Sequence, residues 1–392
     1  MASWDVFRLL LVIRSGLRRL QGKDNQSGET LNADTTAKSN FKSTTDSTAI
    51  SRSQRFKDFI YNLCYFPDQA GPWIIPAFLK GRKLVRQCNL EVIFATGSPW
   101  SSLITGYLVS KTTKTPLVVD FRDPWINNPF HQSKGELLDR WSSSLEKKVV
   151  NHAAAVSLNT EALMEEFLQR YPELNRNKFF VMPNGIDQRD FEQIKQDSPM
   201  ERDTNTLSLI HAGFLYGVRD PAPLLDALRR VNETLEGTGQ RIVFTQIGDI
   251  SLSYDIRQTY SDLLKNGFLI IEPAKPYRAC LKMLAAADIV VNIQSGTKTQ
   301  IPSKLYDYLA INRPILHLTP EAGALDRLVK KYKLGRSIGL DSTNELEHYL
   351  SEKAAELRQG KQIQEEYPNR KMFLIEDISQ TLANAITRLT KR

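Results

Sequence analysis

Apolar and polar residues alternate in blocks along most of the chain from residue 55 onward. Nine short apolar runs recur, and the stretches between several of them carry apolar residues at spacings of three and four, as at Leu224, Leu225, Leu228 and Val231. Strands that are apolar throughout and alternate with helices predict parallel sheets covered on both faces. The predicted strands are Leu90–Ala95, Leu117–Phe121, Ala153–Leu158, Phe179–Met182, Leu207–His211, Ile242–Ile247, Phe268–Ile271, Ile289–Ile293 and Ile315–Leu318.

These runs form two sets, and the polar stretch 187–205 between them is typical of an interdomain linker. A length of 392 residues also favours two domains. The last segment places five apolar side chains on one helical face: Leu374, Ile378, Leu382, Ile386 and Leu389. We therefore expect an α/β domain over 55–190, a second over 191–370, and a terminal helix over 371–392.

The first 54 residues have a different pattern. Met1–Gln21 reads as a short basic amphipathic helix, and Lys23–Ser53 is polar and almost free of large apolar residues. A segment of the second kind buries too little surface to offset its ordering entropy, so we predict a disordered loop or linker. The basic helix has two interpretations, binding to a membrane surface or packing on its own domain. No apolar run reaches the ~18 residues that a membrane-spanning helix needs.

Charge and cysteine content narrow the class of protein. Lys and Arg number 52 against 44 Asp and Glu, a net charge of +8, which fits a weakly basic enzyme, a membrane-surface protein or a binder of phosphorylated ligands. The three cysteines make no CxxC pair, which argues against a disulfide framework or structural zinc and favours a reducing compartment. No zinc-finger or aromatic RNA-binding motif supports a nucleic-acid partner.

In open parallel sheets, ligands bind at the carboxyl ends of the strands, so the loops there are the candidate sites. The loop HAGFLYGVRDP follows the run Leu207–His211. Gly213 and Gly217 would let backbone amides approach a ligand, and Arg219 would suit a phosphate beside the helix expected from Asp220. The alternative is a tight turn with a solvated arginine.

The segment 294–314 offers a second cationic group. A helix is predicted to start near Ser303, which places Lys304 in its first turn, where free amides and the helix dipole favour an anion. Asp307 lies three residues further on and could accept hydrogen bonds from a ribose diol. The alternative is an ordinary surface pair between Lys304 and Asp307.

Two further loops carry candidate chemistry. DFRDPW packs Asp120, Arg122 and Asp123 beside Trp125, a cluster suited to orienting a hydroxyl or to general-base work, with Trp125 as an apolar platform and His131 near enough to join. The alternative is a structural salt bridge. The pair Asn184–Gly185 is suited to positive φ and a tight turn, and therefore to a hinge.

Several of these pieces, in this order, resemble the retaining family-four glycosyltransferases of GT-B fold (the glycosyl transferase group 1 type). The resemblance covers roughly 66–338. It implies two Rossmann-like domains facing across a cleft, with the nucleotide-sugar mainly on the second domain, the acceptor mainly on the first, and the terminal helix crossing back. The motifs that carry it are DFRDPW, VSLNTEAL, MPNGID, HAGFLYGVRDP, IGD and IPSKLYDYLAINRPIL.

The resemblance also implies roles for single residues. Arg219 and Lys304 would hold the donor diphosphate, and Asp307 would bind the nucleotide ribose. Gly248 would line the nucleotide pocket, and Asp123 would lie in the acceptor-side loop that faces the donor sugar.

The chain departs from the family pattern at two places. Thr299 stands where the paired acidic motif has its first glutamate, eight residues before Asp307. The first domain also lacks the opening strand, the glycine-rich loop and the two strands expected next. Either a piece is missing, or a partner chain supplies it, or the product is inactive.

The sequence therefore predicts a glycosyltransferase that moves a sugar from a nucleotide-sugar to a glycan or lipid-linked acceptor with retention of configuration. The donor is a substrate, and no separate cofactor or metal is expected. The predicted location is cytoplasmic, with peripheral contact at the inner membrane face. The alternative is a degenerate, non-catalytic transferase-like domain that acts as a binding partner.

Overall fold

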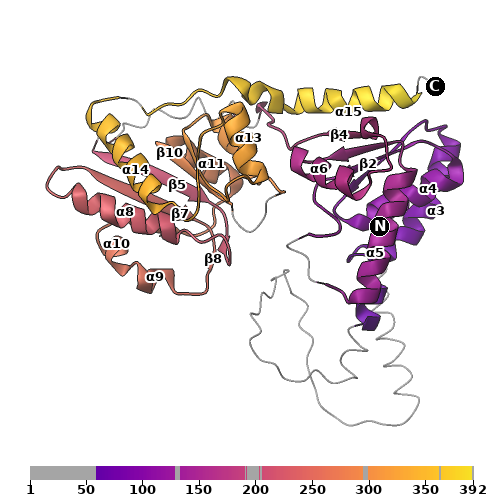
Figure 1. The fold of residues 1–392 in the computed structure, drawn as a ribbon, viewed down its shortest axis with the longest axis horizontal. Coiled ribbons are helices and arrows are strands. Elements are labelled where there is room, and N and C mark those ends of the chain that lie inside the picture. Colours follow the sequence, from indigo (N-terminus) through magenta and orange to yellow (C-terminus); the bar gives the residue numbers. More distant parts are fainter. Residues whose placement is uncertain are drawn as a thin grey trace, which may run out of the picture. The chain divides into compact units, whose positions relative to one another are not determined.

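The computed structural model describes residues 59–128, 133–189, 191, 203, 205–294, 299–361 and 363–390. The basic helix and the linker predicted before residue 54 lie outside these ranges. The chain divides into two compact units between Ala154 and Ala155. Figure 1 shows the helices and strands along the chain with their labels. The domain boundaries derived from the sequence stay a prediction.

The first unit pairs two parallel strands against helices. β1 (Ile93–Gly97) and β2 (Leu117–Phe121) run in register from Ile93 opposite Leu117 to Gly97 opposite Phe121. The helix between them lies close to β1, because a Cβ on Gly106 would be only 2.7 Å from that of Ala95. The other elements are η1 (Gly71–Trp73), α3 (Ile74–Gln87), α4 (Trp100–Thr113) and α5 (Glu136–His152).

The second unit opens with a parallel strand pair around one helix. β3 (Ala155–Leu158) and β4 (Phe179–Val181) pair in parallel, with α6 (Glu161–Arg170) and η2 (Arg176–Lys178) between them in the chain. Thr160 begins α6, since its Oγ1 accepts a hydrogen bond from the Leu163 amide at 3.0 Å.

A six-stranded parallel sheet forms the centre of the second unit, in the order β12-β11-β10-β5-β7-β9. A small parallel pair, β6 with β8, extends the ends of β5 and β7. The strands are β5 (Thr206–Ala212), β6 (Leu215–Tyr216), β7 (Arg241–Ile247), β8 (Ile250–Ser251), β9 (Leu269–Glu272), β10 (Ile289–Ile293), β11 (Ile315–Leu318) and β12 (Arg336–Ile338).

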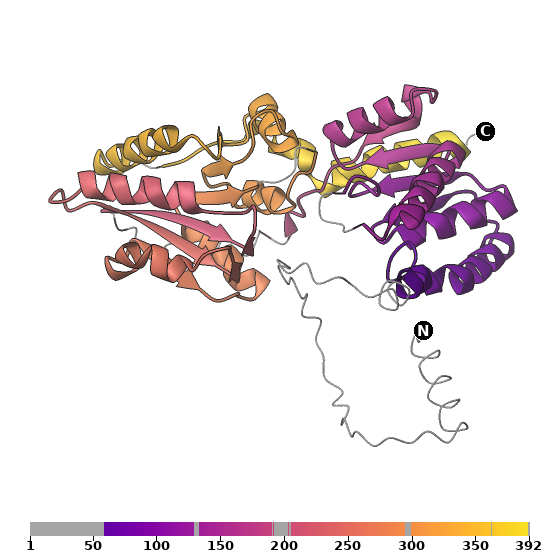
Figure 2. The same cartoon turned by 60° about the horizontal axis from the view of Figure 1, so that its bottom comes forward.

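Helices cover both faces of this sheet, so neighbouring strand residues enter different cores (Figure 2). Ile289 and Val291 pack with α8 and α14, whereas Val290 packs with α11, α12 and α13. This arrangement explains why the strands are apolar throughout. The helices are α8 (Ala222–Thr234), α9 (Ile256–Thr259), α10 (Ser261–Lys265), α11 (Tyr277–Ala286), α12 (Lys304–Ile311), α13 (Ala324–Tyr332), α14 (Thr343–Arg358), η3 (Pro368–Phe373) and α15 (Ile375–Thr390).

All nine predicted strands form, with ends that differ from the predicted ones by up to three residues. The sequence missed β6, β8 and β12, which have only two or three residues each and too little pattern to detect. Within the described residues, no helix combines the length and the apolar character needed to cross a bilayer.

The conformational prediction for Asn184–Gly185 was wrong, since neither residue has positive φ. Glycine is needed there for space instead. A Cβ on Gly185 would lie 2.8 Å from Cδ1 of Ile378 on α15. Next to it, the Ile186 amide donates to the Phe373 carbonyl at 2.7 Å, which ties this segment to the turn before α15.

Candidate functional site

The two cationic residues predicted from separate motifs meet at the carboxyl end of the six-stranded sheet. Arg219 follows β6, and Lys304 is the first residue of α12. The Arg219 charge is one of the causes that lower the pKa of Lys304, so the two groups are electrostatically coupled. Arg219 is oriented by Gln294, whose Oε1 accepts from Nη2 at 3.2 Å, and by the ring of Tyr216, 5.1 Å from the guanidinium carbon to the centroid. The structure therefore brings the predicted pair together.

Lys304 is half-buried. Burial, followed by repulsion from Arg219, lowers its pKa from 10.5 to about 8. The ammonium is thus still mostly charged at neutral pH. Among the described residues, no carboxylate contributes to its pKa. A buried cation of this kind gains most from an anionic ligand, because the ligand supplies the charge compensation that burial removed.

His211, which sequence reasoning did not select, fixes the position of this ammonium. It is the penultimate residue of β5, fully buried, and its Nε2 lies 3.2 Å from Nζ of Lys304. Since an ammonium only donates, Nε2 must be the acceptor and Nδ1 must carry the proton. Burial and the charge of Lys304 push the pKa of His211 well below its usual value, which keeps the ring neutral.

A second buried residue holds the histidine ring. Nδ1 of His211 donates to Oε1 of Gln246 on β7 at 2.7 Å, and Nε2 of Gln246 donates to the Gly213 carbonyl at 2.7 Å. Polar side chains inside the predicted strands Leu207–His211 and Ile242–Ile247 were the signal that could have found this pair, because buried polar groups need partners.

Two of the predicted glycines leave room for the cation. Gly213 has φ +140°, and a Cβ there would overlap Nζ of Lys304 and lie 2.9 Å from its Cε. Gly248 has φ +120°, and a Cβ there would lie 2.9 Å from the Gly213 carbonyl oxygen. Gly217 also has positive φ, at +45°, but open space surrounds it. Gly213 and Gly248 are therefore required by contact and by conformation, whereas Gly217 is required by its turn alone.

The start of α12 is placed as predicted, but its amides are less available than expected. Ser303 is the residue before the helix and is exposed. The amides of Leu305 and Tyr306 already donate to the carbonyls of Pro302 and Ser303, both at 3.1 Å. Anion binding here therefore depends more on the two side-chain cations than on helix amides.

Asp307 lies one turn further along α12, half-buried, and its Oδ1 accepts from the Tyr277 hydroxyl of α11 at 2.9 Å. The carboxylate is held by this phenol at the sheet end. Its use for a ribose remains a proposal.

The helix expected from Asp220 begins two residues later than predicted. α8 begins at Ala222 with Pro221 before it, and Asp220 Oδ1 accepts from the Ala222 amide at 2.9 Å and from the Tyr254 hydroxyl at 2.7 Å.

A cavity of about 500 Å³ adjoins the glycines. It is lined by Gly248 and by residues that follow β7 and β9, including Asp249, Tyr254, Glu272 and Pro273. Gly248 lines this cavity and packs closely on the Gly213 backbone, and Gly213 in turn lies close to the Lys304 amine. The cavity therefore lies near the cationic pair at the sheet end.

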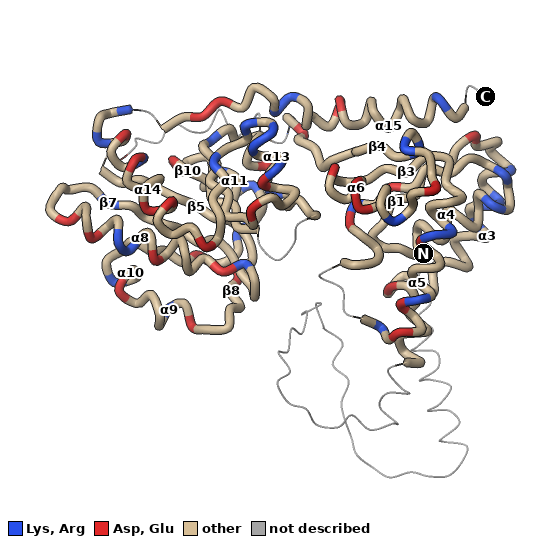
Figure 3. Tube along the Cα trace, viewed as in Figure 1, with Lys and Arg blue, Asp and Glu red and all other residues tan. Residues whose placement is uncertain are grey.

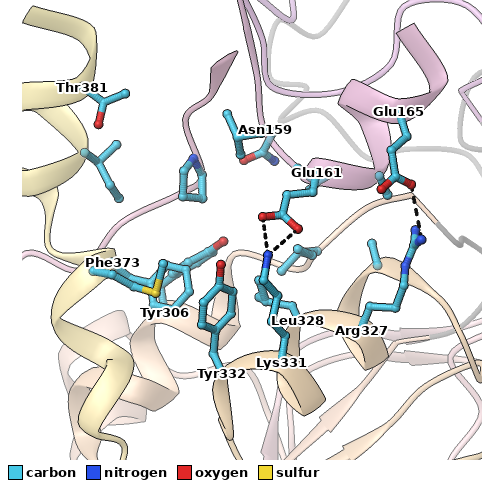
Figure 4. A pocket seen from close by; sticks show the side chains of 18 of the residues that line it. Asn159, Glu161, Glu165, Tyr306, Arg327, Leu328, Lys331, Tyr332, Phe373 and Thr381 are labelled. Carbon is cyan, nitrogen blue, oxygen red and sulfur yellow. Dashed lines mark hydrogen bonds and ion pairs between the residues drawn. The ribbon is translucent and has the colours of Figure 1, made fainter. Parts of the chain in front are cut away.

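A larger cavity, about 710 Å³, lies elsewhere in the second unit (Figure 4). Tyr306, Tyr332 and Phe373 line it, and two ion pairs join α6 to α13 at its edge. Lys331 Nζ lies 2.8 Å from Glu161 Oε1, and Arg327 Nη1 lies 3.3 Å from Glu165 Oε2. The cavity is mostly apolar and includes neither Arg219 nor Lys304, so its size does not make it the candidate site.

Asp123 belongs to the first unit, in the loop after β2, and is half-buried. Its neighbours are fixed: Asp120 is buried, accepts from Thr96 Oγ1 at 2.9 Å, and lies 3.7 Å from Arg122 Nη1. Trp125 is buried, stacks on Trp100 with centroids 5.8 Å apart, and lines a cavity of about 660 Å³ in the first unit. Its use as an apolar platform stays a prediction. His131 lies outside the described residues.

No group of three metal-ligating side chains occurs in the described ranges of the chain. The expected absence of a metal from the reaction stays a prediction.

A family model matches part of the chain, and several solved structures share its fold. Residues 49–190 match the family model described as Glycosyltransferase Family 4. A search of curated proteins found no match to the sequence.

Three solved structures illustrate the likeness in fold. Anabaena Alr3699/HepE in complex with UDP has a TM-score of 0.54 and 18% identity, covering 80% of this chain and 82% of that one. α,α-Trehalose 6-phosphate synthase from Burkholderia multivorans has a TM-score of 0.54 and 11% identity, covering 86% of this chain and 84% of that one. Sucrose-phosphate synthase from Thermosynechococcus elongatus has a TM-score of 0.52 and 12% identity, covering 80% of this chain and 77% of that one. The chain thus has the α/β fold with parallel sheets of GT-B glycosyltransferases.

Proposed function

We propose that this protein transfers a sugar from a nucleotide-sugar to an acceptor hydroxyl, with Arg219 and Lys304 binding the donor diphosphate. The observation that carries the proposal is the buried, histidine-held ammonium of Lys304 coupled to Arg219 at the carboxyl end of the sheet. The GT-B fold and the family match over 49–190 agree with it.

The chemistry requires charge stabilisation at the leaving group. The bond between the anomeric carbon and the phosphate oxygen breaks, a bond to the acceptor oxygen forms, and the acceptor proton passes to a base or to the departing phosphate. Negative charge develops on the diphosphate, and two cations fixed before the reaction stabilise it without reorganisation. Retention of configuration and independence from metal are part of the proposal, as is Asp123 on the acceptor side.

The remaining parts of the donor have candidate positions in the same region. The cavity of about 500 Å³ beside Gly248 would take the base, and Asp307 would bind the ribose. Gly213, Gly217 and Ser303 would bring backbone close to the phosphates. The Anabaena protein is described in complexes with UDP and with UDP-glucose, which makes UDP-sugars the first donors to test.

The acceptor would be a glycan or a lipid-linked glycan, as in polysaccharide biosynthesis. In this proposal the protein works in the cytoplasm with peripheral contact at the inner membrane face, and nucleic acid is not a partner.

A non-catalytic binding protein is the second candidate, and Thr299 favours it. This residue stands where the resemblance expects a glutamate, and its carbonyl accepts from Thr160 Oγ1 at 2.8 Å. Thr299 therefore has a hydroxyl, and no carboxylate, with which to bind the donor sugar.

Turnover assays decide between the two candidates. Wild type would be incubated with UDP-, GDP- and dTDP-sugars, with glycan and lipid-linked acceptors, and nucleotide binding would be measured by calorimetry in parallel. Lys304→Ala and Arg219→Ala should each lose binding and turnover, while Lys265→Ala at the exposed last residue of α10 serves as the matched control. Nucleotide binding without turnover would favour the non-catalytic protein. Equal nucleotide binding by wild type and Lys304→Ala would contradict the assignment of the site.

Thr299→Glu tests whether the missing carboxylate limits catalysis, by restoring it. If the missing carboxylate is what limits sugar recognition, this substitution raises turnover of the preferred donor without changing UDP affinity.

A further inference from the structure

Helix α3 of the first unit presents large apolar side chains to solvent. Its inner side packs on α4, where Val85 is buried and Gly81 approaches Val109. Its outer side exposes Ile75 by 70% and Leu79 by 57%, and Trp73, directly before the helix, by 48%. Residues of this size at such exposure on one helix are unusual unless the surface binds something.

The exposed side continues as a basic surface. Ile75, Leu79, Lys83 and Arg86 follow each other at spacings of four, four and three, so they share one side of the helix. Lys80 and Arg82 flank this row. We call these residues, with Trp73, the α3 surface: an apolar start followed by a cationic end.

The cations of the α3 surface have no local counter-charge. No acidic residue occurs between Asp68 and Glu91 in the sequence. In the part of the chain that the structure describes, none of Lys80, Arg82, Lys83 and Arg86 takes part in an ion pair. Figure 3 shows the concentration of Lys and Arg along α3.

This combination identifies the chemistry of a partner. Exposed Ile, Leu and Trp gain free energy when they enter an apolar phase, and neighbouring Lys and Arg gain it from an anionic surface. A nucleic acid would satisfy the cations and leave Ile75 and Leu79 in water. A second copy of the same surface would bring like charges together. An anionic bilayer surface satisfies both halves, because a helix lying in the interface inserts its apolar side chains while its cations meet the headgroups.

We propose that the α3 surface docks this protein on the surface of an anionic lipid bilayer, independently of the sugar-transfer function proposed above. Trp73, Ile75 and Leu79 enter the interface, and Lys80, Arg82, Lys83 and Arg86 bind lipid headgroups. The surface is distinct from the basic segment 1–21, and it belongs to the described fold.

Vesicle sedimentation with the full chain tests the proposal. The probes are phosphatidylcholine vesicles with and without an equal share of phosphatidylglycerol. Wild type should sediment with the anionic vesicles, and added salt should weaken this binding because it screens the cations. Lys80→Gln with Lys83→Gln should lower the partition coefficient on the order of tenfold, and Leu79→Ser should lower it severalfold.

Matched controls separate docking from charge and folding effects. Lys265→Gln with Lys361→Gln removes the same charge from exposed sites of the second unit, and Ile375→Ser removes an exposed apolar side chain from α15. The controls should sediment as wild type does, and thermal melts should show that all variants fold. UDP binding should be unchanged in the α3 variants, so failure of this proposal is distinguishable from failure of the transferase proposal.

Three outcomes would overturn the proposal. The first is no difference between the two kinds of vesicle. The second is binding that survives in the α3 variants and is lost in Arg18→Gln with Arg19→Gln, which would assign docking to the segment 1–21. The third is a dimer, detected by sedimentation velocity, that α3 substitutions dissociate without any effect on vesicle binding.

Discussion

Nζ of Lys304 lies 3.2 Å from Nε2 of His211, a buried neutral imidazole whose other nitrogen donates to Gln246. The amine therefore has a fixed direction before any ligand arrives. Fixing a charged group in advance removes the entropic cost of ordering it when the ligand binds.

His211→Ala should weaken UDP binding about tenfold, because the ammonium loses its acceptor and its fixed direction and one hydrogen bond to a charged group is worth ~1.5–3 kcal/mol. Calorimetry with UDP measures this. His317→Ala is the control: His317 is equally buried, with Asn292 Nδ2 3.2 Å from its Nδ1, but it is not a contact of Lys304. The control should lower the melting temperature and leave UDP affinity unchanged. Unchanged affinity in His211→Ala would contradict the positioning role.

UDP affinity should fall as pH rises through about 8, the pKa of Lys304 in the free protein. The sign follows from the lowered pKa: below it the ammonium is charged and attracts the diphosphate, and above it the neutral amine does not. A bound anion raises the pKa, so affinity decreases by at most about tenfold per pH unit above this point.

Lys304→Arg should flatten this pH profile, because a guanidinium stays charged in that range. Among the groups near Lys304, burial lowers the pKa of His211, which stays neutral, and burial raises the pKa of the Cys280 thiol. Cys280→Ser should therefore retain the wild-type profile. A profile that is flat in wild type would show that Lys304 does not bind the anion in its charged form.

Gly213→Ala should reduce UDP affinity more than tenfold, as an order-of-magnitude expectation for a displaced charged contact. The added Cβ would overlap the Lys304 amine, which must move away from His211. Gly237→Ala provides the control, since Gly237 also has positive φ, at +77°, but nothing lies within 4 Å of the added Cβ. Both variants place a side chain at positive φ and should each lose ~1–3 kcal/mol of stability from backbone strain. Only the first should lose nucleotide binding, and equal losses of affinity would show that strain alone is responsible.

The two ion pairs between α6 and α13 should contribute little to stability, although Figure 4 shows them at the edge of the cavity of about 710 Å³. The Glu161, Lys331, Glu165 and Arg327 side chains are all about half exposed. Glu161→Gln and Glu165→Gln should each change the free energy of unfolding by less than ~1 kcal/mol, and the change should shrink in salt. Chemical denaturation at low and high salt measures this, with Leu225→Ala in the core as a variant that should lose ~2–5 kcal/mol. A salt-insensitive loss of several kcal/mol from either glutamine variant would show that these pairs are structural.

The pattern of side chains was sufficient to predict the strands of the two main sheets, because each buried strand is a short, continuous apolar run in the sequence. Ile289–Ile293 and Leu117–Phe121 were predicted residue for residue, since runs apolar on both sides occur where helices cover both faces of a sheet. β6 and β8 were missed because two residues carry no periodicity.

The sequence by itself determined the alternation of strands and helices, the existence of two α/β sets, and the cations Arg219 and Lys304 at strand ends, because these depend on residues near each other in the chain. Only the tertiary structure decided that His211, 93 residues from Lys304, supplies its acceptor. It also decided that the amides of Leu305 and Tyr306 are already bonded, and that the outer side of α3 is left uncovered. The physical reason is that hydrogen-bond partners and burial are set by which distant segments pack together, and local pattern does not encode those pairings uniquely.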